Sequence, residues 1–405
     1  MTFNTFPFLE LLSEIVDNRG KTCPTSETGI PLIATNCVRN DSLYPLFEKV
    51  RYVDDETYKT WFRGHPKPGD MLFVTKGTPG RVCWVPDPVN FCIAQDMLSI
   101  RANGKIVYPK FLFALLRSQE TQKLIENMHV GTLIPHFKKG DFDQLHLSIP
   151  SDRKVQETIG DIYFNISEQI DLNRQTNQTL EAIAQALFKE WFVDFNFPGA
   201  TGEMQESELG PIPKGWRVGK LEDVCELNPR LNLRRGIIAK YIEMKNLSQN
   251  SLSIEEPRDR EFTSGSKFQN GDTLLARITP CLENGKTGFV DFLNEQEVGW
   301  GSTEFLVLRG KKEVGQYFVY CLSRTQSFRE FAIQSMVGSS GRQRVVESIL
   351  SDYPLVIPDR KIVSSFSKKM RELFNLVKTN SEQASILSQI RDNLLPKLLS
   401  GEIDV

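Results

Sequence analysis

The 405-residue sequence lacks the features of a membrane-spanning or disulfide-stabilised protein. It contains no run of about eighteen apolar residues, so no helix is expected to cross a membrane. Its first residues show no basic stretch followed by an apolar core, so no signal peptide is predicted. The seven cysteines are scattered and never form a Cys-x-x-Cys pair. We therefore predict buried free thiols, no metal site, no membrane partner and a cytoplasmic location.

Motifs for catalysis are also missing. The four histidines all lie in the first half and have no metal-ligand spacing. No Asn/Asp-Pro-Pro-Tyr motif of adenine methyltransferases occurs, and the nearest string begins at Asn228. No glycine-rich loop for S-adenosylmethionine follows a predicted strand. The Pro-Asp pairs at Asp87 and Asp359 lack the acidic-x-Lys sequence of a metal-dependent nuclease. These absences predict a protein that is not an enzyme, with no catalytic residue and no cofactor of its own.

The chain also has no strong excess of charge of either sign, since its net charge is −2. Residues 1–153 carry 18 Lys and Arg against 17 Asp and Glu, and residues 216–360 carry 20 against 19. A nucleic-acid-binding domain often has a clear basic excess. If this chain binds nucleic acid, it must therefore use local basic clusters or share the phosphate contacts with a basic partner.

The dominant positive feature is an internal duplication. Each half contains Gly-Asp, a short hydrophobic run, a turn rich in glycine and proline, and a second strand-like run, with similar segments before and after. The paired segments are 30–36 with 240–246, 69–90 with 271–292, 111–116 with 317–322, and 145–150 with 353–358. Two related globular domains, at 1–153 and 216–360, are therefore predicted.

A long helix is predicted after each globular domain, at 154–192 and 361–400 within a C-terminal segment 361–405. Apolar positions separated by alternating steps of four and three recur at an offset of 207 residues, which is the heptad pattern of a coiled coil. Each helix would cover about 38 residues, or roughly 57 Å. Asn173 and Asn380 occupy the same seam position, where they would either fix the register or loosen the packing. The segment 193–215 is rich in proline, glycine and acidic residues and is predicted to be a linker.

A duplicated chain has pseudo-twofold symmetry, which suits duplex DNA because the DNA backbone is itself twofold symmetric. Two diverged domains could read two different half-sites, and the helices would set the distance between them. At this point several motifs carry a family resemblance. They are the repeated Gly-Asp-x-Leu strand, the linker end at 208–216 and the ending Leu-Leu-Pro-Lys-Leu-Leu-Ser-Gly-Glu at 394–402. In this order they resemble the specificity subunits of type I restriction-modification systems.

The resemblance covers nearly the whole chain and implies the following expectations. The fold is α/β, with two tandem pseudo-symmetric target-recognition domains connected by two long antiparallel coiled-coil helices. The chain reads a bipartite target in double-stranded DNA without catalysing a reaction. It docks two adenine methyltransferase subunits and restriction/translocase subunits, and S-adenosylmethionine, ATP and magnesium belong to those partners. The first domain begins with Phe6-Pro-Phe, which departs from the Gly215-Trp216 entry of the second, so the two domains differ from each other in how they start.

The candidate DNA-binding residues lie in two loops of each half. In the turns 75–81 and 277–286, glycine lets main-chain N–H groups approach a phosphate and the cations add charge. The loops 131–139 and 338–344 follow a helix in each half, and Arg-Gln-Arg in the second is suited to pairing with guanine and adenine. The alternatives are plain surface hairpins and loops that grip only phosphates. The candidates are Lys76, Arg81, Lys138, Lys139, Arg277, Lys286, Arg342, Gln343 and Arg344.

The ends of the two long helices carry more apolar residues than one coiled-coil seam requires. Such an excess can mark a partner interface, and the candidates are Trp191, Phe192, Leu394 and Leu398. The alternative is that these side chains pack beneath the globular domains.

Three other interpretations of the whole chain remain open at this stage. The first is a coiled-coil scaffold with no role on DNA. The second is a fused methyltransferase or nuclease with an unusual active site. The third is a specificity subunit that serves another restriction class.

Overall fold

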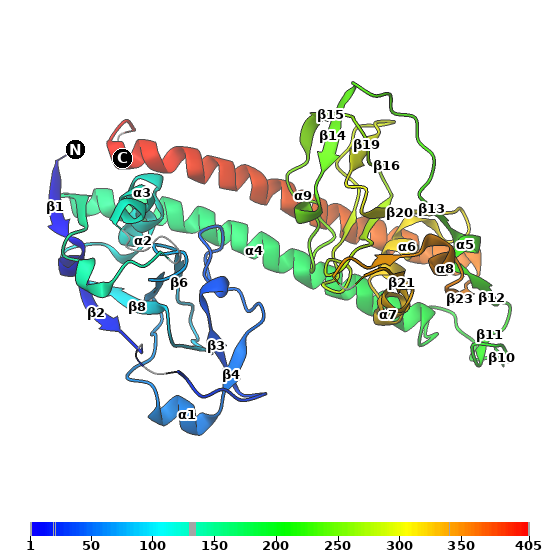
Figure 1. Cartoon of the computed structure of the whole chain (residues 1–405), viewed down its shortest axis with the longest axis horizontal. Coiled ribbons are helices and arrows are strands. Elements are labelled where there is room, and N and C mark those ends of the chain that lie inside the picture. The colour runs from blue at the N-terminus through cyan, green and yellow to red at the C-terminus, as the bar shows by residue number, and fades with distance from the viewer. Residues whose placement is uncertain (1, 19, 21, 129–134, 340, 404–405) are drawn as a thin grey trace. The chain divides into compact units, whose positions relative to one another are not determined.

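The computed structural model describes residues 2–18, 20, 22–128, 135–339 and 341–403. The chain divides into two compact units (Figure 1). Unit 1 comprises Met1–Asn173 and Gln383–Val405, and unit 2 comprises Arg174–Glu382. Two helices, α4 (Arg153–Phe192) and α9 (Arg360–Ser400), each begin in one unit and end in the other. The two long helices predicted from the heptad pattern are thus confirmed.

Unit 1 is an α/β domain that contains two main sheets. A four-stranded antiparallel sheet has the order β2-β8-β5-β6, a three-stranded sheet has the order β4-β3-β7, and β1 pairs with β9. The strands of unit 1 are β1 Phe3–Pro7, β2 Leu12–Val16, β3 Ile30–Ile33, β4 Arg51–Val53, β5 Met71–Val74, β6 Val82–Trp84, β7 Cys92–Ile93, β8 Met97–Ala102 and β9 His146–Pro150. Its shorter helices are η1 Phe8–Leu11, η2 Thr35–Cys37, α1 Asp55–Thr60, α2 Pro109–Arg117, α3 Gln119–Met128 and η3 Lys139–Asp141.

Unit 2 repeats this plan. Its sheets have the orders β13-β20-β17-β18 and β15-β14-β19-β16, and β12 pairs with β23 as β1 pairs with β9. The strands are β10 Met204–Gln205, β11 Ile212–Pro213, β12 Arg217–Lys220, β13 Cys225–Leu227, β14 Ile238–Ile242, β15 Arg258–Glu261, β16 Ser266–Phe268, β17 Thr273–Ala276, β18 Thr287–Phe289, β19 Gly299–Gly301, β20 Phe305–Gly310, β21 Met336–Val337, β22 Arg344–Val345 and β23 Pro354–Ile357. The shorter helices are α5 Leu221–Val224, η4 Met244–Asn246, α6 Gly315–Ser323, α7 Gln326–Gln334 and α8 Glu347–Ser351.

The repeated Gly-Asp motif has the same structural role in both units. The Asp70 carboxylate is buried, accepts a hydrogen bond from the Lys67 main-chain N–H (2.8 Å) and pairs with Arg101 (2.7 Å). In unit 2, Asp272 accepts from the Gln269 N–H (2.8 Å) and pairs with Arg309 (2.7 Å). Each aspartate therefore fixes the turn into a central strand and joins that strand to the next one in the sheet. The duplication seen in the sequence is a duplication of structure.

The long helices pack against each other within each unit. In unit 2, Trp191 of α4 contacts Phe366 of α9 with ring centroids 5.7 Å apart, whereas Asn177 contacts Asn380. Residue numbers fall on one helix as they rise on the other, so the packing is antiparallel. In the described part of the chain, no helix combines the length and apolar character needed to cross a membrane.

Candidate nucleic-acid interface

The two predicted basic loops of unit 1 meet in space. Lys76 forms an isolated antiparallel bridge with His136, and the Phe137 N–H donates to the Thr75 carbonyl (2.9 Å). The Gly77 N–H donates to the Pro135 carbonyl (3.0 Å). The exposed Lys138 and Lys139 follow directly. We call this contact between 75–77 and 135–137 the unit 1 junction; residues 131–134 of the predicted loop lie outside the described residues.

Unit 2 builds the same junction from 277–279 and 343–345. Ile278 forms the antiparallel bridge with Arg344, the Thr279 N–H donates to the Gln343 carbonyl (3.1 Å), and the Val345 N–H donates to the Arg277 carbonyl (2.9 Å). Ser340 of the predicted loop lies outside the described residues. In each unit, segments roughly sixty residues apart in the sequence are thus joined by main-chain hydrogen bonds.

A third segment, which sequence reasoning missed, completes each junction. The carbonyl of Asp96 accepts from the Thr75 N–H (2.8 Å), and the carbonyl of Glu304 accepts from the Arg277 N–H (3.0 Å). Both acidic residues immediately precede a central strand, β8 or β20. A signal was present in the sequence, because Asp-Met-Leu-Ser-Ile-Arg at 96–101 aligns with Glu-Phe-Leu-Val-Leu-Arg at 304–309.

Each of these carboxylates pairs with a predicted DNA-binding cation. The Asp96 carboxylate lies 3.7 Å from the Lys76 ammonium. The Glu304 carboxylate pairs with the Arg344 guanidinium at 2.6 Å, and this contact lowers the pKa of Glu304. The junction therefore carries one paired cation in each unit, contributed by the first loop in unit 1 and by the second loop in unit 2.

The other predicted DNA-binding residues differ in whether their side chains are free to contact DNA. Arg277 donates through Nη2 to the Val345 carbonyl (2.9 Å), and Lys286 donates to the Met244 carbonyl (2.8 Å), so both hold main chain in place. Arg342 is exposed, whereas Gln343 is partly buried and its main-chain N–H is bonded to the Thr279 hydroxyl (3.0 Å). Lys138, Lys139 and Arg342 are therefore the exposed cations among these remaining candidates, and Arg344 is exposed as well but pairs with Glu304.

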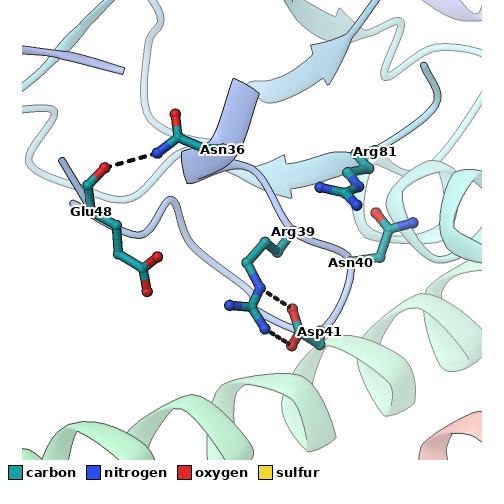
Figure 2. Close-up of a pocket in the computed structure, with 6 residues that line it drawn as sticks. All are labelled: Asn36, Arg39, Asn40, Asp41, Glu48 and Arg81. Atoms are coloured by element: carbon teal, nitrogen blue, oxygen red, sulfur yellow. Dashed lines mark hydrogen bonds and ion pairs between the residues drawn. The ribbon is translucent and has the colours of Figure 1, made fainter. Parts of the chain in front are cut away.

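Arg81 lines a polar hollow of about 560 Å³ in unit 1 (Figure 2). The other lining residues are Asn36, Arg39, Asn40, Asp41 and Glu48. Asn36 donates to the Glu48 carbonyl (2.8 Å), and the Asn40 side-chain oxygen accepts from the Val82 N–H (3.0 Å). Arg39 makes a two-point contact with Asp41 (3.0 and 2.6 Å). Arg39 and Asn40 are polar residues of the type that contact bases, and they belong to none of the motifs that mark the predicted loops.

The apolar candidates for a partner interface are mostly core residues. Trp191, Phe192 and Leu398 are only 4, 7 and 2% exposed, and Leu394 is partly buried against the core of unit 1. Trp191 and Phe192 belong to the core of unit 2, where they contact Phe366. Of the two alternatives for these side chains, their burial supports packing beneath the globular domains, because a buried ring offers little surface to a partner.

Among the described residues, no group of three or more His, Cys, Asp and Glu side chains is placed to hold a metal ion. Six of the cysteines are buried. Burial raises the pKa of the Cys92 and Cys225 thiols to about 12. These thiols are therefore neutral over the physiological range and are poor nucleophiles and metal ligands.

The same fold is built twice, with cationic side chains at the same junction in each unit, which is an arrangement typical of nucleic-acid-binding proteins made of paired modules. The family model described as "Type I restriction modification DNA specificity domain" matches residues 12–182 and 213–392. The chain therefore belongs to the family of type I restriction-modification specificity subunits. Its function is sequence-specific recognition of the DNA target as the non-catalytic part of a type I complex, whose cofactors reside in the modification and restriction subunits.

Individual relatives agree with this assignment. The chain is 26% identical to the type I restriction enzyme HindI specificity subunit of Haemophilus influenzae, over 83% of this chain and 87% of the relative. It is 24% identical to the MjaIX specificity subunit of Methanocaldococcus jannaschii, over 78% of this chain and 76% of the relative. The crystal structure of the type I S subunit from M. genitalium has the same fold, with a TM-score of 0.52 and 13% identity over 98% of this chain and 96% of that one.

Proposed function

We propose that this chain reads a bipartite DNA target, with the domain at 1–153 addressing one half-site and the domain at 216–360 addressing the other. The observation that carries this proposal is the junction built twice, at 75–77 with 135–137 and at 277–279 with 343–345. Its segments differ in sequence between the units although their backbone pairing is the same. Two domains that recognise different base sequences need the same backbone arrangement with different side chains on it.

Local charge, rather than a net basic excess, supplies the phosphate contacts in this proposal. Lys138 and Lys139 are exposed directly beside the unit 1 junction, and Arg342 is exposed beside the unit 2 junction. The arginine and amide side chains at and near the junctions supply the base contacts. The remaining phosphate contacts come from the partner subunits, since neither domain is strongly basic.

The helices α4 and α9 serve as the spacer between the two readers and as the docking surface for two methyltransferase subunits. Five large apolar side chains on these helices are 42–57% exposed and support such a role better than the buried residues Trp191 and Phe192. They are Leu172, Ile183, Leu376, Ile386 and Ile390. Restriction/translocase subunits complete the complex, which acts in the cytoplasm. Extrusion of the target adenine belongs to the methyltransferase partner.

The test is a domain exchange in the assembled modification complex. The chain is co-expressed with its methyltransferase subunits in a host without adenine methylation, and methylated adenines are mapped across the genome. A two-part motif is expected, and replacement of residues 1–153 by the first domain of another specificity subunit is expected to change one part of it. Replacement of 216–360 is the reciprocal control and must change the other part. Methylation without a two-part motif, or both parts changing after one exchange, would overturn the proposal.

A further inference from the structure

The Arg344 side chain is held by Glu304 in a defined orientation. Nε of Arg344 lies 3.0 and 2.9 Å from the two carboxylate oxygens, and Nη2 lies 2.6 Å from one of them. The Arg344 and Glu304 side chains are 46% and 24% exposed, so the pair lies at the surface. Glu304 contacts the side of the guanidinium group and leaves its end uncovered.

The uncovered end has the donors that guanine requires. An arginine has five N–H donors, and the side contact uses the Nε hydrogen and one Nη2 hydrogen. In the described part of the chain, no hydrogen bond engages Nη1. One hydrogen on Nη1 and one on Nη2 therefore point away from Glu304, parallel to each other. Two parallel donors match the O6 and N7 acceptors of guanine in the major groove.

The backbone on both sides of this pair is fixed. The Glu304 carbonyl accepts from the Arg277 N–H (3.0 Å), and the Arg277 carbonyl accepts from the Val345 N–H (2.9 Å). The residues that carry the carboxylate and the guanidinium are thus joined through Arg277 in one hydrogen-bonded junction. Because Glu304 restricts the rotamers of Arg344 before DNA arrives, less side-chain entropy is lost on binding.

The charge of the pair also favours a base contact over a phosphate contact. Glu304 neutralises Arg344 locally and would repel a phosphate brought to the same place. A base edge carries partial charges only, so the repulsion is smaller and the direction of the two donors matters more. In unit 1, Asp96 holds Lys76 more loosely, at 3.7 Å, and an ammonium has no paired planar donors.

We propose that Arg344 reads a guanine in the half-site addressed by unit 2, and that Glu304 is the positioning residue for this contact. This inference rests on the function proposed above, and it assigns one base to one residue. Unit 1 lacks the equivalent two-point contact, because its junction presents the ammonium of Lys76.

The experiment measures binding of the complete methyltransferase complex to a target library in which each base pair of the motif is varied. The variants are Arg344→Ala, Arg344→Lys and Glu304→Gln, with Lys312→Ala as control because it removes an exposed cation beyond the far end of β20. Arg344→Ala and Arg344→Lys are expected to reduce discrimination at one G·C pair by roughly five- to hundredfold. Glu304→Gln is expected to relax preference at that same pair, and the control to leave all preferences unchanged.

Replacement of the assigned guanine by 7-deazaguanine provides a second measurement. The loss of N7 is expected to weaken the wild-type complex about tenfold and to leave Arg344→Ala unaffected, because that variant no longer makes the contact. A wild-type complex without any base preference would contradict the proposed function itself. A sequence-specific wild type whose Arg344 variants keep every base preference, and bind all sequences more weakly, would overturn this inference alone.

Discussion

Asn380 donates a hydrogen bond from Nδ2 to Oδ1 of Asn177, at 2.9 Å, where α9 crosses α4 in unit 2. Asn177 is 7% exposed and donates in turn to the Val377 carbonyl (3.1 Å) and to the Ser381 hydroxyl (2.9 Å). Both the carbonyl oxygen and the amide nitrogen of the Asn177 side chain are therefore hydrogen-bonded at a buried position between the helices. A polar pair of this kind fixes the register, because a shift of either helix would leave these groups without partners.

Replacement of Asn177 by leucine is expected to lower the free energy of unfolding by about 1–3 kcal/mol. The reason is that the Asn380 amide and the Val377 carbonyl lose a partner that buried leucine cannot replace. The measurement is the denaturant midpoint, followed by helical circular dichroism. Gln178→Leu is the matched control, since it places the same side chain at an exposed neighbouring position. Equal midpoints for the two variants would show that the pair contributes nothing.

The hydrogen-bonded pair of Asn177 and Asn380 also illustrates what the sequence could predict. The heptad spacing correctly predicts two long helices, and the duplication predicts two α/β units of the same plan. The sequence pairs Asn173 with Asn380 by their equal place in the repeat, but the residue that contacts Asn380 is Asn177. Equivalence in a repeat is a symmetry relation and not a contact, and the contact depends on how far the antiparallel helices are shifted along each other.

The binding surface was predictable to a smaller extent. Basic residues in loops are visible in the sequence, but which of them face outward depends on tertiary contacts. Arg277 and Lys286 donate to main-chain carbonyls. Glu304 lies beside Arg344 because β20 pairs with β17, and Ile278, just after β17, bridges to Arg344. A basic cluster in the sequence indicates a DNA-binding surface, but it gives no sign of a carboxylate that orients one of its cations.

Trp191 tests whether the apolar end of α4 is core or interface. Its ring is 4% exposed and lies in the core of unit 2 beside Phe366, so Trp191→Ala is expected to lower the free energy of unfolding by about 3–5 kcal/mol. Val193→Ala, at a position 52% exposed, is the control and is expected to change stability by less than about 0.5 kcal/mol. Thermal unfolding of the isolated chain checks both values. A Trp191 variant of wild-type stability that no longer binds the methyltransferase would instead make this residue a contact.

Asp291 is expected to make the stability of the chain depend on pH. Burial raises its pKa to about 6, and Glu382 adds to this effect while Lys378 opposes it. Because the folded pKa lies above the unfolded value of 3.8, the folded chain binds more protons between pH 4 and 6. Its contribution to stability is therefore complete below about pH 4 and is lost as the pH rises through about 6.

Asp291→Asn is accordingly expected to stabilise the chain by about 1–3 kcal/mol at pH 8 and to have no effect near pH 3.5. Lys378→Met, which removes the opposing cation, is expected to move the loss of stability to higher pH. Denaturant titrations between pH 3.5 and 8 give both profiles. The same stability difference between Asp291→Asn and wild type at every pH would refute the assignment.

Lys138 and Lys139 are expected to contact phosphates, in contrast to Arg344. Both are exposed beside the unit 1 junction, and a phosphate contact carries no sequence information. In the methyltransferase complex, the double change to alanine is expected to weaken binding to every sequence by a similar factor and to reduce the slope of log K against log salt by about 1.8. Lys105→Ala, beyond the opposite end of β8, is expected to leave the slope unchanged. A changed base preference with an unaltered salt slope would show that these lysines contact bases. The reason is that removal of a phosphate contact reduces the number of counterions released on binding, and so lowers the slope for every DNA sequence.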